Sequence, residues 1–228
     1  MLNELILISI FGGLMALDNT EAFQTMVSQP LVIGPLVGFL LGDVSCGLKI
    51  GILFQLMAIW VMPIGTATFP DPATGSVVGS CGFIILTRLF PDRTNLILWV
   101  ILIFVVFFNL FAGWTLIKQR QFNSKLLSKA DLYAEKAWIP GFNYLFFLGL
   151  SGSFFRGLAV IILGIFCIFV LLKPLVKFLS FIPEGYLQDI ELPIWGLGIG
   201  TMIHLFGRKR NLTWCLFGVI LGIVIILL

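Results

Sequence analysis

Residues 95–117 decide the class of fold, and they read NLILWVILIFVVFFNLFAGWTLI. A helix needs about 20 predominantly apolar residues to cross the hydrocarbon core of a bilayer. The stretch is long enough, and its apolar character is continuous. Strands of a membrane β-barrel instead alternate apolar and polar residues over about ten positions. Residues 95–117 therefore predict a membrane-spanning helix.

The composition of the whole chain agrees with this stretch. Of the 228 residues, 59% are hydrophobic and 11% are charged, and the mean hydropathy is +1.09. Soluble domains carry about 25% charged residues, and disordered chains are poor in the aromatic residues of which this chain has many. We predict an all-α integral membrane protein, a polytopic helical bundle forming one domain over residues 1–228. The net charge of +3 gives no reason to expect a nucleic-acid partner.

Other apolar segments are short and interrupted by glycine or proline. Such segments are typical of re-entrant hairpins and broken helices, in which polar backbone lies at membrane depth against protein or a water-filled cavity. Residues 140–155 and 157–172 are expected to be two half-helices that together cross the membrane once. This pattern is typical of transporters and not of simple anchors.

A basic segment at residues 118–137 follows the long apolar stretch, and a second basic cluster lies at residues 208–210. The positive-inside rule places both in the cytoplasm. We favour a solvated helix near anionic lipid headgroups for residues 118–137, and a docking surface for a soluble partner is the alternative.

Residues 29–79 carry most of the recognisable motifs. Glycines at positions 34, 38 and 42, and again at 47 and 51, recur at four-residue or near four-residue spacing, which we interpret as a packing stripe between two helices. Asp43 and Lys49 flank the turn between these helices, at an interface or paired with each other. Gln55 interrupts an apolar segment, and its amide requires partners that either a helix or a ligand hydroxyl supplies.

Residues 63–72 read PIGTATFPDP, and three prolines in ten residues exclude a regular helix. Thr66, Thr68 and Asp71 supply hydroxyl and carboxylate groups of the kind that bind sugar hydroxyls. The alternative is a proline-rich loop in which Asp71 caps the following helix.

Motifs in this region resemble those of the membrane-embedded IIC subunit of the mannose-type sugar phosphotransferase system. The matching residues are Gln29-Pro30-Leu31, Gly34-Pro35-Leu36-Val37-Gly38, Leu41-Gly42-Asp43, Cys46-Gly47-Leu48-Lys49-Ile50-Gly51, Gln55, Pro63-Ile64-Gly65 and Phe69-Pro70-Asp71. Upstream, Leu17-Asp18 is similar to a Leu-Asp element of the family. In the second half of the chain, Arg156 matches the family weakly.

The resemblance implies a sugar permease of the bacterial inner membrane that works by alternating access. It implies delivery of the sugar to a cytoplasmic IIB subunit, which is phosphorylated through IIA, and pairing with a IID membrane subunit in an oligomer within the lipid bilayer. The chain would carry no catalytic residues and no cofactor of its own. The expected substrate-binding residues are Asp71, Gln55, Thr66, Thr68 and Asp18, with Asp18 orienting the neighbouring segment.

Three positions depart from the family pattern: Gln29 replaces an arginine, Gln55 replaces a glutamate, and Phe69 replaces a proline. These changes leave open a non-transporting membrane scaffold or receptor for phosphocarrier proteins. A broken-helix transporter without phosphotransferase coupling is the other alternative. An enzyme acting alone is disfavoured, because the four cysteines lie far apart, the single histidine is His204, and no P-loop motif is present.

Overall fold

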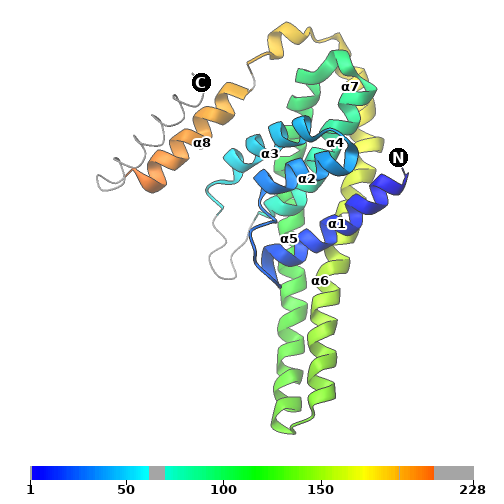
Figure 1. The fold of residues 1–228 in the computed structure, drawn as a ribbon, viewed down its shortest axis with the longest axis vertical. Coiled ribbons are helices and arrows are strands. Elements are labelled where there is room, and N and C mark those ends of the chain that lie inside the picture. Colours follow the sequence, from blue (N-terminus) through cyan, green and yellow to red (C-terminus); the bar gives the residue numbers. More distant parts are fainter. Residues whose placement is uncertain (1, 62–69, 190, 208–228) are drawn as a thin grey trace.

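The computed structural model describes residues 2–61, 70–189 and 191–207, and the regular elements of these residues are helices and helical turns (Figure 1). The α-helices are α1 (Leu2–Thr20), α2 (Pro30–Leu41), α3 (Val44–Ala58), α4 (Pro72–Leu89), α5 (Thr94–Glu135), α6 (Ile139–Cys167), α7 (Lys173–Phe178) and α8 (Glu191–Phe206). Within these residues, four helical segments are long and apolar enough to cross a membrane. The predicted all-α membrane fold is confirmed.

Helices α2 and α3 form a tight hairpin along the predicted glycine stripe. An added Cβ at Gly34 would lie 2.6 Å from the Cα of Gly51, so only glycine allows this approach. The turn is made by Gly42 in the left-handed conformation, with φ 75°, and by Asp43, whose carboxylate accepts from the Cys46 N–H at 3.0 Å. With 12 and 15 residues, these helices are about 18 and 22 Å long. Each is too short to cross a bilayer of about 30 Å, as expected for a re-entrant hairpin.

Helix α4 is the central element of the bundle. It packs against α1, α2, α3, α5 and α6, and the 14 residues that follow Pro72 are all buried. Small residues allow this packing on every side. An added Cβ at Gly75, for example, would lie 2.6 Å from the Cγ of Asn109 on α5. The start of α4, where Asp71 lies, is therefore enclosed by its neighbours.

Helices α5 and α6 run side by side and extend well beyond the rest of the bundle (Figure 1). Helix α5 has 42 residues and is about 63 Å long, about twice the thickness of the hydrocarbon core. Its apolar half, residues 95–117, packs within the bundle. The basic segment continues the same helix as far as Glu135, and most of its side chains are exposed or half-buried.

The expected break between residues 140–155 and 157–172 is wrong. One continuous helix, α6, runs from Ile139 to Cys167 and continues through a π-helical turn at Ile168–Leu172. Gly157, which lies next to the expected break, permits close packing on α1, because an added Cβ would lie 3.3 Å from the Cα of Gly13. Gly157 thus brings the middle of α6 against α1.

The two charges that flank the hairpin turn do not pair with each other. Asp43 caps α3, whereas the Lys49 ammonium forms an ion pair with Glu191 at 2.6 Å. Glu191 begins α8, which packs on α3. The ion pair therefore joins α8 to the re-entrant hairpin.

Candidate functional site

Asp71 immediately precedes α4 as its N-cap residue and is completely buried. Its carboxylate accepts from the Thr74 backbone N–H at 3.2 Å and from the Thr74 hydroxyl at 2.7 Å. This is the geometry of a helix N-cap, so the capping role considered for Asp71 from the sequence is present. Its own backbone N–H donates to the Asn109 carbonyl of α5 at 3.1 Å.

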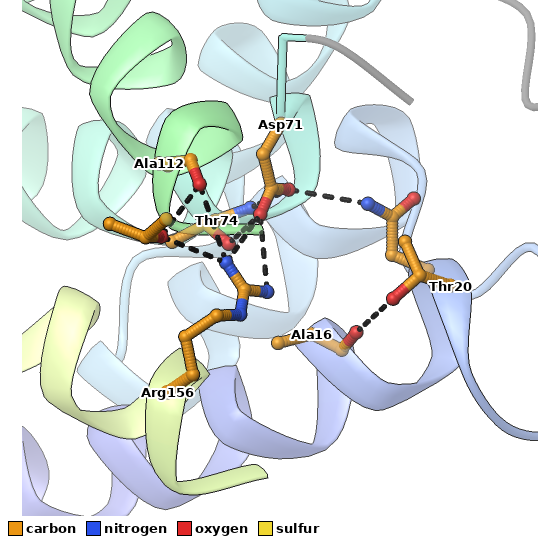
Figure 2. A network of polar contacts seen from close by, with 8 residues as sticks. Ala16, Thr20, Asp71, Thr74, Ala112 and Arg156 are labelled. Carbon is orange, nitrogen blue, oxygen red and sulfur yellow. Dashed lines mark hydrogen bonds and ion pairs between the residues drawn. The ribbon is translucent and has the colours of Figure 1, made fainter. Parts of the chain in front are cut away.

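Arg156 supplies the positive charge next to Asp71. Its Nη1 lies 3.4 Å from the Asp71 Oδ2, and its side chain is 8% exposed. The same nitrogen donates to the Thr115 hydroxyl at 3.2 Å and to the Ala112 carbonyl at 3.4 Å, both on α5. Figure 2 shows the guanidinium pointing at the Asp71 carboxylate and at Ala112. An isolated buried charge is costly, and this arrangement neutralises both groups.

Asn19 joins α1 to this network. Its Nδ2 donates to the Asp71 Oδ1 at 3.2 Å. One carboxylate thus connects α1, α4, α5 and α6, either directly or through Arg156. We call Asn19, Asp71, Thr74, Thr115 and Arg156 the carboxylate network.

Asp18 is also buried, at 5% exposure, but its partners are local. One oxygen accepts from the Thr25 N–H at 2.9 Å and the Thr25 hydroxyl at 2.6 Å, and the other accepts from the Ser28 N–H at 3.1 Å. Asp18 therefore holds the loop between α1 and α2. The loop includes three non-glycine residues with positive φ, namely Phe23, Gln24 and Met26.

Gln55 contacts the start of α2 from α3. Its Oε1 accepts from the Leu31 N–H at 3.2 Å, and its Nε2 donates to the Gln29 Oε1 at 3.4 Å. The two positions at which glutamine replaces a charged residue of the family pattern are therefore in contact. Gln55 and Asp71 have different partners, so the described hydrogen bonds do not join them.

A polar cavity of about 910 Å³ lies between the α1–α2 loop and the middle of α5. Its volume is at the upper end of the range for small-molecule sites, about 300–1,000 Å³. All lining residues except Met26 and Ile117 are polar. They are Asp18, Asn19, Thr20, Glu21, Gln24, Met26, Ser28, Gln29, Ile117, Arg120, Gln121, Asn123 and Ser124.

The polar wall is held together by further hydrogen bonds. Asn123 of α5 donates from Nδ2 to the Glu21 Oε2 at 3.4 Å and accepts from Gln119 at 3.1 Å. Amides, hydroxyls and carboxylates arranged around an open volume offer many directed donors and acceptors, which is what a polyhydroxylated ligand requires. Among the described residues, no group of three or more His, Cys, Asp or Glu side chains is arranged to hold a metal ion.

The predicted site residues have different relations to this cavity. Asp18 lines it, whereas Asp71 and Gln55 lie one side chain behind it, in contact with Asn19 and Gln29 respectively. Thr66 and Thr68 lie outside the described residues. The prediction that these five residues bind a substrate stays a prediction.

Sequence reasoning did not find Asn19 and Asn123 or the partnership of Arg156 with Asp71. Arg156 did carry a signal, since it is the only charged residue between positions 139 and 172. A lone arginine in an apolar helix requires a buried partner, although its identity is not encoded locally. Asn19 lies in a polar run that resembles an ordinary loop.

The sequence model of a family described as "PTS system sorbose-specific iic component" matches residues 2–227. The fructose permease IIC component of Bacillus subtilis is 37% identical over 76 residues, which are 33% of this chain and 26% of that protein. The sorbose-specific EIIC component of Klebsiella pneumoniae is 31% identical over 78 residues, which are 34% and 29% of the two chains. An Escherichia coli permease IIC component named for N-acetylgalactosamine matches over 50% of its length. The matches thus cover at most half of these relatives.

Two solved structures share the fold. A chain described as "Structure of membrane protein" superposes with a TM-score of 0.72 at 20% identity, covering 97% of this chain and 87% of the other. A chain from the complex of the mannose transporter ManYZ with microcin E492 superposes with a TM-score of 0.62 at 16% identity, covering 97% and 86%.

Proposed function

Because the chain belongs to the family of sorbose-specific IIC components of phosphotransferase systems, we propose that it is a sugar-translocating permease subunit whose sugar binds in the polar cavity. The resemblance expected from residues 29–79 is confirmed at the level of the family. The observation that carries the proposal is a cavity lined mostly by polar residues, in a protein whose described residues include four membrane-length helical segments. Polar side chains are costly at a surface that faces lipid. In a cavity they can form hydrogen bonds with the hydroxyls of a hexose.

The position of the cavity suits delivery of sugar to the cytoplasm. Arg120, Gln121 and Ser124 line it from the first turns of the basic segment, which the positive-inside rule assigns to the cytoplasmic side. We propose that this state opens inward and that alternating access exposes the same groups to the outside. The sugar then passes to a cytoplasmic IIB subunit, phosphorylated through IIA, whose phosphohistidine supplies the phosphoryl group. A IID subunit in the bacterial inner membrane completes the oligomer.

Within this proposal, Asp71 and Gln55 act on the sugar through the residues that they hold. Asp71 orients Asn19, Gln55 orients Gln29, and Asp18 fixes the loop that forms one wall. Direct hydrogen bonds between sugar hydroxyls and Asp71, Gln55, Thr66 and Thr68 in another conformation remain part of the prediction.

The test is uptake of radiolabelled sugar in cells that carry Asp71→Ala together with the partner subunits. We expect uptake to fall at least tenfold, because both the ion pair and the orientation of Asn19 are lost. Lys49→Ala, which removes an exposed ion pair outside the cavity, is the control for loss of a charge, and immunoblots of membranes control for the amount of protein. Unchanged affinity and rate in Asp71→Ala would remove Asp71 from the site.

A scaffold for phosphocarrier proteins is a second candidate, and the extension of α5 beyond the bundle favours it. The exposed basic side chains of this extension offer a surface for a soluble partner. Recruitment of IIB without any sugar binding would support the scaffold. Transport that persists in a strain lacking phosphoenolpyruvate-dependent phosphorylation would instead support an uncoupled transporter.

A further inference from the structure

The backbone of Gln29 is fixed at the start of α2, but its side chain does not cap the helix. The Gln29 carbonyl accepts from the Val32 and Ile33 N–H groups, both at 2.9 Å, and its N–H donates to the Met26 carbonyl at 3.1 Å. Gln29 occupies the N-cap position without a capping hydrogen bond from its side chain. The amide is thus left for other partners, and Gln29 lines the polar cavity.

Hydrogen-bond chemistry determines which end of the Gln29 amide faces Gln55. The Leu31 N–H can only donate, so the Gln55 atom that faces it, at 3.2 Å, must be the oxygen. The Gln55 NH₂ then faces Gln29, at 3.4 Å, and Gln29 must present its own oxygen to it. The NH₂ end of Gln29 is not used in this pair and is the end available to the cavity.

The same reasoning shows that the amide of Asn19 is oriented the other way, with its oxygen and not its NH₂ group available to the cavity. An ionised carboxylate only accepts hydrogen bonds, so the Asn19 NH₂ must face Asp71, at 3.2 Å. The Asn19 oxygen is the end available to the cavity, which Asn19 also lines. Two amides on the cavity wall are therefore oriented in opposite senses by residues behind them.

We propose that Gln29 and Asn19 determine specificity, with Gln29 donating to the ligand and Asn19 accepting from it. This proposal rests on the assignment of the cavity as a sugar site. The ligand has to place an acceptor oxygen (of a hydroxyl, ring ether or acyl group) at Gln29 and a hydroxyl hydrogen at Asn19. Gln55, although it does not line the cavity, acts as a positioning residue that sets the polarity of Gln29.

Fluorinated sugars test which amide donates and which accepts, because a fluorine atom accepts hydrogen bonds weakly but cannot donate them. Binding to the purified chain is measured for D-mannose, D-fructose, L-sorbose and N-acetyl-D-galactosamine, and then for every monodeoxy and monofluorodeoxy analogue of the sugar that binds most tightly. At the hydroxyl beside Gln29, we expect the fluoro analogue to bind within about threefold of the parent and the deoxy analogue about tenfold more weakly. At the hydroxyl beside Asn19, both analogues should lose about tenfold.

Gln55→Glu distinguishes this mechanism from simple contact. A glutamate still accepts from the Leu31 N–H, but it offers only an acceptor to Gln29, whose amide must then turn its oxygen to the cavity. We expect the parent sugar to bind within about threefold of its original affinity, and the tolerated fluoro analogue to lose about tenfold. Gln29→Glu keeps the bond to the Gln55 NH₂, replaces the donor in the cavity with an acceptor, and should give the same loss if Gln55→Glu does not fold.

The outcomes separate this inference from the function on which it rests. If none of the four sugars binds the wild-type chain, the proposed function fails. Suppose instead that a sugar binds, and that neither variant changes the affinity for the tolerated fluoro analogue relative to the parent sugar. The proposed orientation of the two amides is then overturned, while the sugar site stands. Gln188→Glu adds the same charge at an exposed glutamine outside the cavity lining, and an equal change in that variant would also overturn the proposal.

Discussion

The two buried aspartates of the site, Asp71 and Asp18, are stabilised in different ways. Asp71 is bound by an arginine from another helix and by residues of α1 and α4. The hydrogen bonds described for Asp18 come from two backbone N–H groups and a hydroxyl within ten residues along the chain. The first carboxylate holds helices together, whereas the second holds a loop. Loss of Asp71 or its partner should therefore destabilise the helix bundle, whereas loss of Asp18 should mainly affect the loop between α1 and α2.

The largest effect is expected from Arg156→Met. Methionine fills a similar volume but leaves the Asp71 carboxylate buried without its counter-charge, which costs roughly 3–5 kcal/mol when one partner of a buried pair is removed. Thermal unfolding of the protein in detergent should show a clear loss of stability. Stability equal to that of the wild type would mean that the pair is not closed in the folded protein.

The double variant Asp71→Asn/Arg156→Met is the control for this result. Asparagine can still accept from the Thr74 N–H, and no charge remains buried. We expect the double variant to be more stable than Arg156→Met, because breaking a buried pair costs more than replacing both partners. Additive losses would show that the charges do not interact.

A smaller and more local effect is expected from Asp18→Asn. Three donors converge on the Asp18 carboxylate, and an asparagine turns its NH₂ toward at least one of them. Leaving a buried donor unsatisfied costs about 1–3 kcal/mol. Limited proteolysis should detect faster cleavage at residues 21–29, with the rest of the bundle still protected. Equal loss of protection in α4 and α6 would show that Asp18 also supports the helix packing.

The smallest effect is expected from Thr25→Val, which removes the hydroxyl that donates to Asp18 at 2.6 Å. A hydrogen bond to a charged group contributes about 1.5–3 kcal/mol, and the partial exposure of this loop places the loss at the lower end of that range. Thr25→Ser keeps the hydroxyl and is the matched variant. If the two substitutions lower the unfolding temperature equally, the methyl group and not the hydroxyl is responsible.

Some features of the fold and the site follow from local sequence. Residues 95–117 are apolar for longer than any soluble element requires, and the glycines of residues 34–51 repeat at the spacing of a helix face. Each pattern is contained in one contiguous stretch of sequence, so the membrane helix and the close hairpin could be predicted. The break expected near Gly157 was wrong because a glycine that ends a helix and a glycine that admits a neighbouring helix look identical in the sequence.

The partnerships of the site could not be predicted in the same way. Asp71 and Arg156 are 85 positions apart, and Gln29 and Gln55 are 26 apart. Many other polar residues were equally available as partners. The expected role of Asp18 came from the family resemblance, and the described donors to its carboxylate lie within ten residues of it along the chain.

The amino-acid sequence by itself determined the membrane environment, the helical class and the family, since these depend on apolar length and on short contiguous motifs. Only the tertiary structure decided which polar groups neutralise one another and which ones face the cavity. The physical reason is that a buried polar group must find a partner, and the identity of that partner depends on which helices the packing brings together.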